Sequence, residues 1–116
     1  MTIPSVCLLL RVYIGKELFA GGSPVYEEIV YEAKKANLGG VTVIQAVEGF
    51  GHIGVLQSED NPHNNDLPVL IEVIDSPEKI RNFIPVVAKL LGNHGLITTS
   101  EVHVVHQGML LPHHGP

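Results

Sequence analysis

The chain has 116 residues, of which 45% are hydrophobic and only 16% are charged. That length suits one domain, and the composition excludes a disordered chain, because disorder requires low hydrophobicity and high net charge. Seven Lys and Arg against twelve Asp and Glu give a net charge of -5, which argues against a general electrostatic grip on nucleic acid or an anionic membrane. Seven histidines equal the strong bases in number and need an explanation.

The N-terminal segment carries no basic region before its apolar stretch, and Arg11 interrupts that stretch, so no signal peptide is predicted. No apolar run approaches the roughly 20 residues of a membrane span. The single cysteine, Cys7, lies in an apolar strand pattern, where a buried and inert thiol is favoured over a nucleophile. We therefore expect a cytoplasmic protein without direct membrane insertion.

The first half of the chain predicts a strand, a helix and a second strand. Residues 6–14 are apolar at both alternating sets of positions, which is typical of a strand covered on two sides. Ser23 and Pro24 are predicted to be the N-cap and first position of a helix, which Gly39 and Gly40 are expected to stop. A second strand follows over residues 41–47.

The second half repeats this order with the same spacing of its end signals. Residues 67–74 predict a third strand, and Ser76 with Pro77 repeats the cap-plus-proline start of a helix. Gly92 is predicted to end this helix, and Pro85 inside it is expected to kink it or to delay its regular start. Residues 96–106 then predict a fourth strand.

Two copies of strand-helix-strand predict an α+β, ferredoxin-like βαββαβ domain. Its four-stranded antiparallel sheet would carry both helices on one face, with a long loop between the second and third strands. The domain is expected over residues 1–107, followed by a flexible C-terminal tail over 108–116. Because two helices cover only one face and the first strand is apolar on both, further copies of the chain are predicted to cover the other face.

The long connection over residues 48–66 leaves two interpretations open. It begins with Gly49, Phe50 and Gly51 and contains several carboxylates, His52 and His63, but no Lys or Arg. It is either an acidic, solvated hairpin extension or a recognition loop whose glycine-rich base approaches a ligand at a subunit junction. A phosphate could meet only backbone N–H groups and histidines in this loop.

The histidines could bind a metal ion or simply be scattered over the surface. His103 and His106, three apart on a predicted strand, would lie on opposite faces, whereas His52 and His63 could converge across the loop. No HExxH spacing or Cys-His cluster occurs. No catalytic set can be assembled from Cys7 and loop residues either, so we do not expect an enzyme.

Several short motifs occur in the order and spacing of a known superfamily. They are Tyr-Ile-Gly at residues 13–15, Pro-Val-Tyr-Glu at 24–27, Gly-Val-Thr-Val at 40–43, Ala-Val-Glu-Gly-Phe-Gly-His at 46–52 and Leu-Pro-Val-Leu-Ile-Glu-Val-Ile-Asp at 67–75. With them the chain resembles the PII signalling superfamily, and most of all its small, uncharacterised PII-like branch. The resemblance covers roughly residues 6–106.

This resemblance implies a homotrimer whose sheets line the interior. It also implies a T-loop, here residues 51–66, that contacts a partner protein, and adenine nucleotides bound in the clefts between subunits. Carried over by position, the residues implied to bind the ligand are Gly49, Phe50, Gly51, His52, Gly92, His94, Gly95 and His106.

The implied site departs from that of the signalling proteins in its charges. His52 stands where they have an arginine, and His106 falls on one of two further arginine positions. The turn over residues 92–95 is shorter than theirs and carries no Lys or Arg. Because neutral histidine attracts phosphate far less than arginine does, AMP, ADP or a small anion is favoured over ATP. If His52 and His106 face the anion, its affinity should rise below about pH 6.5.

The sequence thus predicts a PII-like regulatory module that binds a small metabolite or adenine nucleotide between subunits. The alternative hypothesis is divalent metal binding or tolerance, which a related ferredoxin-like trimer family suggests. In that case the ligands would be His52, His63, His103 and His106.

Overall fold

The computed structural model describes residues 3–46 and 67–108. Predicted features outside these ranges are Val47 at the end of the second strand, the loop with its base at residues 49–52, His63, and the tail from residue 109. The elements in chain order are β1 (Val6–Gly15), β2 (Phe19–Ala20), β3 (Ser23–Pro24), α1 (Val25–Lys35), β4 (Val41–Gln45), β5 (Pro68–Asp75), α2 (Pro77–Leu91) and β6 (Leu96–His103).

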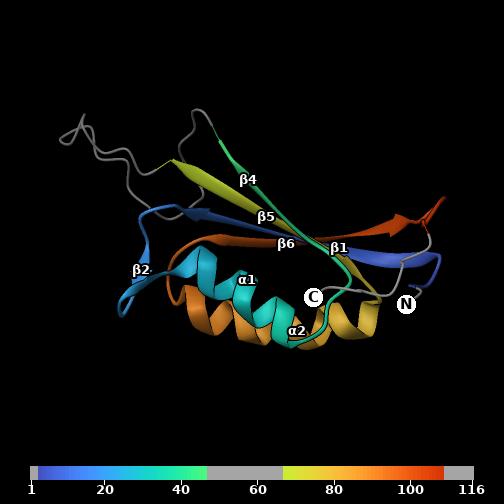
Figure 1. Cartoon of the computed structure of the whole chain (residues 1–116), viewed down its shortest axis with the longest axis horizontal. Helices are drawn as coiled ribbons and strands as arrows, with labels where there is room; N and C mark the ends of the chain where they lie inside the picture. The colour runs from blue at the N-terminus through green and yellow to red at the C-terminus, as the bar shows by residue number, and fades with distance from the viewer. Residues whose placement is uncertain (1–2, 47–66, 109–116) are drawn as a thin grey trace, which may run out of the picture.

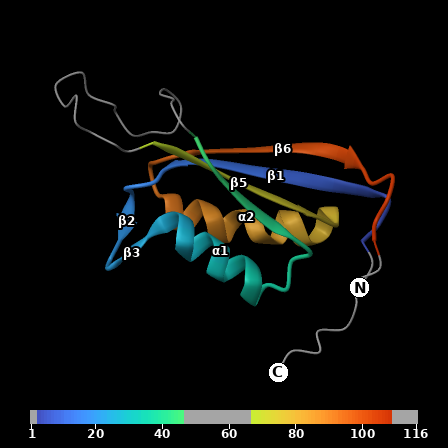
Figure 2. The same ribbon diagram turned by 45° about the horizontal axis from the view of Figure 1, so that its top comes forward.

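Four of the strands form one sheet in the order β4-β5-β1-β6, and every neighbouring pair is antiparallel. Both helices lie against the same face of this sheet (Figures 1 and 2). Strand order and helix placement are those of a ferredoxin-like α+β domain, so the predicted fold class is confirmed. Within the described residues, no helix is long and apolar enough to cross a membrane.

The core lies between the sheet and the two helices. Alternate residues of β1 and β5 are buried there, because successive side chains of a strand point to opposite faces. One face of each helix supplies the other half, at the three- and four-residue spacing of an amphipathic helix. The buried cluster includes Leu10, Val12, Ile14, Val69, Ile71, Val73, Ile29, Ala33, Ile80, Phe83 and Val87.

The other face of the sheet, here called the open face, is covered by neither helix (Figure 2). It exposes the apolar side chains of Ile44, Ile74 and Leu96, with Ile44 46% exposed. At its centre Arg11 and Glu72 pair across neighbouring strands, with Nε donating to Oε2 at 2.9 Å. In a single chain, therefore, an apolar surface with one ion pair faces water.

The start of α1 differs from the prediction, because Ser23 does not cap it. Pro24 is the N-cap residue, with extended backbone angles, and no side chain caps the helix. Ser23 and Pro24 instead pair with β2 in a small hairpin. The Val25 N–H donates to the Leu18 carbonyl at 2.8 Å, which holds the chain extended up to the helix.

The end of α1 also lies earlier than predicted. Asn37, at φ +59°, adopts the left-handed conformation that terminates the helix. The Asn37 N–H donates to Lys34 and the Leu38 N–H donates to Ala33, as in a Schellman motif. Gly39 and Gly40 therefore do not stop the helix, but belong to the turn that leads into β4.

The ends of α2 agree with the sequence. Ser76 accepts a hydrogen bond from the Lys79 N–H at 3.3 Å, Pro77 is the first helical residue, and Gly92 follows the last turn at φ +60°. The helix begins at Pro77, so Pro85 does not delay its start.

Strand β6 ends at His103, three residues before the predicted end. The Val104 N–H still donates to the Ser5 carbonyl at 2.7 Å. Beyond this bond, residues 105–108 belong to no strand. His106 therefore lies in the segment after the strand.

Candidate ligand site

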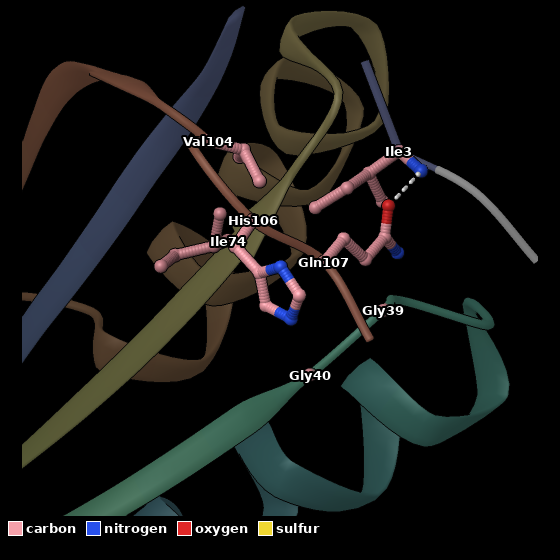
Figure 3. A pocket seen from close by; sticks show the side chains of 7 residues that line it. All are labelled: Ile3, Gly39, Gly40, Ile74, Val104, His106 and Gln107. Carbon is pink, nitrogen blue, oxygen red and sulfur yellow. Dashed lines mark hydrogen bonds between the residues drawn. The ribbon is translucent and has the colours of Figure 1, made fainter. Parts of the chain in front are cut away.

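A pocket of about 270 Å³ lies where β5 and β6 end and β4 begins (Figure 3). Its lining comes from four separate parts of the chain, and we call it the His106 pocket. The lining residues are Ile3, Gly39, Gly40, Ile74, Val104, His106 and Gln107.

Hydrogen bonds between the two ends of the described chain shape one side of this pocket. The Ile3 N–H donates to the Gln107 side-chain oxygen at 3.1 Å (Figure 3). The Val104–Ser5 bond ties the same two segments together one step closer to the sheet. These bonds place His106, which is exposed, between Val104 and Gln107 at the mouth of the pocket.

The opposite side of the pocket is the Gly39–Gly40 turn between α1 and β4. The Gly39 N–H donates to Asp75 Oδ2 at 2.7 Å, and a β-carbon at Gly39 would lie 3.3 Å from that oxygen. A β-carbon at Gly40 would meet no atom within 4 Å. The wall is thus fixed at Gly39 and open at Gly40.

The chemistry of the His106 pocket is mainly apolar, through Ile3, Ile74 and Val104. Its polar side chains are the imidazole of His106 and the carboxamide of Gln107, and neither Lys nor Arg lines it. Such a lining suits a flat or branched apolar group with a hydrogen-bonding edge. It offers no permanent positive charge to a phosphate.

The predicted glycine turn over residues 92–95 lies at the other end of the sheet. The register pairs Leu96, at the start of β6, with Tyr13, whereas His103 pairs with Val6. Gly95 is required by packing, because a β-carbon there would lie 2.9 Å from the Tyr13 carbonyl. His94 is exposed at the tip of this turn.

The structure therefore does not bring the predicted residues together within one chain. Gly92, His94 and Gly95 lie at the end of the sheet where the chain leaves β4 and returns to β5, and His106 lies at the opposite end. Gly49, Phe50, Gly51 and His52 are outside the described residues. A site that includes both His106 and the 92–95 turn needs a second copy of the chain.

Sequence reasoning missed most of the His106 pocket. It also missed Lys16, a cation that follows β1 at the opposite end of the sheet. Gly39 and Gly40 were predicted only as a helix stop, and Ile3 and Gln107 carried no signal. Lys16 follows β1, and its N–H donates to the Leu67 carbonyl at 3.0 Å, where the chain returns from the long loop. Lys16 lies outside the connection over residues 48–66, which contains no Lys or Arg.

The remaining candidates from the sequence were a metal site built from histidines and the thiol of Cys7. Within the described ranges, no three His, Cys, Asp or Glu side chains gather to hold a metal ion. The Cys7 thiol is fully buried and donates to the Pro4 carbonyl at 3.1 Å. Burial, and secondarily the charge of Asp75, raises the pKa of the Cys7 thiol, and the predicted burial of this thiol is confirmed.

The fold is that of PII-like proteins. The CPII protein of Thiomonas intermedia K12, a nitrogen regulatory PII-like protein solved with ADP, AMP and bicarbonate, superposes with a TM-score of 0.62. It shares 15% identity, over 87% of this chain and 90% of CPII. A putative PII-like signaling protein from Thermus thermophilus superposes at 0.54 with 18% identity, over 85% and 87% of the two chains. The resemblance predicted from the sequence is confirmed at the level of the fold.

The chain belongs to the DUF190 family, described as "Uncharacterized ACR, COG1993", whose profile matches residues 7–104. A UPF0166 protein of Aquifex aeolicus is 33% identical over 100 residues, which are 84% of this chain and 92% of that protein. The UPF0166 protein MJ1524 of Methanocaldococcus jannaschii is 29% identical over 96 residues, or 83% and 89% of the two chains.

Proposed function

We propose that this chain is a PII-like regulatory protein that forms a homotrimer and binds a small ligand between its copies. The proposed ligand is AMP or ADP rather than ATP, or a small anion. The proposed binding residues are Gly49, Phe50, Gly51, His52, Gly92, His94, Gly95 and His106, together with the rest of the His106 pocket. Residues 51–66 would present the signal to a partner protein.

The observation that carries this proposal is the separation of His106 from the 92–95 turn. In a ring with cyclic symmetry, one surface of each copy meets a different surface of the next. Such an interface can join the His106 end of one subunit to the 92–95 end of its neighbour. Each cleft of the ring would then contain one complete site.

The open face supports assembly independently of any ligand. Ile44, Ile74 and Leu96 expose apolar surface there, and burying such surface stabilises a complex by roughly 25 cal/mol per Å² before the costs of association. A surface of this kind on a sheet typically marks a protein-protein interface. The cheapest matching surface is the same face of another copy.

The charges favour a ligand with few phosphates. Neither the His106 pocket nor the 92–95 turn contains Lys or Arg, so these two parts of the proposed site offer three phosphates no permanent counter-charge. The pocket's volume of about 270 Å³ is slightly below the usual range for ligand sites, which fits a pocket that the neighbouring copy completes. A base would occupy the apolar pocket while the phosphate meets His106 and backbone N–H groups.

We propose that ligand binding is signalled to the partner protein through the loop over residues 51–66. The loop follows β4, which begins directly after the Gly40 wall of the pocket, and leads into β5. A ligand that binds one arrangement of the loop more tightly shifts the population toward that arrangement. We propose regulation rather than catalysis, since the Cys7 thiol is fully buried and does not line the His106 pocket.

Calorimetry of the untagged chain with AMP, ADP, ATP and bicarbonate tests the proposed function. We expect AMP or ADP to bind with one site per copy and ATP to bind more weakly. A ligand at a hundred times its Kd should stabilise the fold by about 2.7 kcal/mol, which a thermal shift detects. Absence of both heat and thermal shift with every ligand would contradict the proposal.

A further inference from the structure

Asp75 is the one charged or polar side chain that is buried within the described residues, at 2% exposure. It ends β5, and its two carboxylate oxygens accept from two different segments. Oδ1 accepts from the Ser76 N–H at 2.6 Å, and Oδ2 accepts from the Gly39 N–H at 2.7 Å. The carboxylate thus joins the start of α2 to the turn between α1 and β4.

A buried carboxylate needs compensation for its lost hydration, and backbone N–H groups at the start of a helix provide it. The Ser76 bond is local, because it joins neighbouring residues. The Gly39 bond does something further, because Gly39 belongs to the wall of the His106 pocket. Asp75 itself does not line that pocket.

The space around Gly39 shows how tightly this wall is held. A β-carbon at Gly39 would lie 3.3 Å from Asp75 Oδ2 and 3.5 Å from Ile3 Cγ2, and Ile3 also lines the pocket. The turn is therefore clamped between the carboxylate and the N-terminal segment. Among the described residues, the Asp75 carboxylate is the acceptor that holds the Gly39 N–H in place.

We infer that Asp75 is a positioning residue for the His106 pocket: its carboxylate fixes the Gly39–Gly40 wall before any ligand binds. The ligand's affinity then depends on a side chain that does not touch it. The part of this inference that concerns affinity rests on the proposed function, whereas the part that concerns the wall does not.

The test compares Asp75→Asn and Asp75→Ala with the matched control Ser76→Ala, which loses the α2 cap but keeps the carboxylate. NMR amide exchange at Gly39 reports the wall, and calorimetry with AMP as the probe reports the pocket. We expect the Asp75 variants to speed Gly39 exchange at least about tenfold beyond the global change and to weaken AMP binding about tenfold. Ser76→Ala should leave both within about twofold of the wild type once its lower stability is accounted for.

The two readouts separate failure of this inference from failure of the proposed function. If wild-type protein binds none of AMP, ADP and bicarbonate, the proposed function fails, and Gly39 exchange alone decides whether Asp75 holds the wall. Unchanged Gly39 exchange in folded Asp75 variants overturns the inference, as does unchanged AMP affinity when exchange has increased. Should both variants fail to fold, an unprotected Gly39 amide in the wild type also overturns it, and a protected one supports it.

Discussion

Arg11 and Glu72 lie opposite each other on β1 and β5, and their side chains form a 2.9 Å ion pair in the middle of the open face. In a single chain both side chains remain partly exposed, and such pairs contribute only about 0.2–1 kcal/mol. If other copies cover this face, the pair becomes buried among apolar side chains. Breaking it would then leave one uncompensated charge, which costs about 3–5 kcal/mol.

Glu72→Ala and Arg11→Ala should therefore weaken assembly far more than they weaken the fold of one copy. We expect each single variant to dissociate at a concentration at least about tenfold higher than the wild type, and the double variant to recover part of the loss. Sedimentation velocity over a dilution series measures this. Equal dissociation of all four proteins would show that the pair is not in the interface.

Filling the His106 pocket from its open wall should block the ligand without disturbing the fold. A β-carbon at Gly40 meets nothing within 4 Å, so the side chain of Gly40→Val starts in open space next to the pocket. We expect AMP binding to weaken at least about tenfold in calorimetry. Gly22→Val is the matched control, because its β-carbon is equally free and lies in the β2–β3 hairpin. Comparable affinity in both variants would place the ligand elsewhere.

The Cys7 thiol should resist modification until the protein unfolds. Burial and the nearby charge of Asp75 raise the pKa of this thiol, so the thiolate forms only at a pH above its ordinary range. The protonated thiol's contribution to stability is complete below that ordinary range and is lost as the pH rises through the raised value. Reaction with a disulfide reagent at pH 8 should be slow in native protein and fast in denaturant. Labelling of the native chain at the rate of a free thiol would contradict the buried position.

Two serines that look alike in the sequence should differ when replaced. Ser76 caps α2 through the Lys79 N–H, so Ser76→Ala should lower the free energy of unfolding by about 1 kcal/mol. Ser23 caps nothing, so Ser23→Ala should change it by less than about 0.5 kcal/mol. Urea denaturation of both variants checks the pair. Equal losses of unfolding free energy in the two variants would support the original prediction that Ser23 caps α1.

That contrast shows why the sequence predicted one helix start and missed the other. The Ser76 cap joins residues three apart, so local spacing is enough to find it. The start of α1 depends on the Val25–Leu18 bond across a hairpin, which no periodic pattern indicates. The end of β6 was also missed, because Val104 and Val105 continue the apolar pattern past His103, the last residue that pairs with β1.

The strand order and the helix-covered face could be predicted because they follow from alternation and repetition. The His106 pocket could not, since its walls come from residue 3, residues 39–40, residue 74 and residues 104–107. Of these, His106 alone was predicted to bind the ligand of the subunit cleft, and that role rested on the resemblance. Gly39 was interpreted as a helix stop, but Asn37 is the residue that ends α1.

Mixed oligomers of two variants test whether each ligand site is shared between two copies of the chain. His106→Glu and His94→Glu place a repelling charge at opposite ends of the chain, so neither variant alone should bind AMP. Refolding the two together in equal amounts yields mixed trimers in which one of the three clefts has both natural ends. Calorimetry should then recover about a quarter of the wild-type AMP sites. If mass spectrometry confirms mixed trimers and no AMP binding returns, the site is not shared between copies.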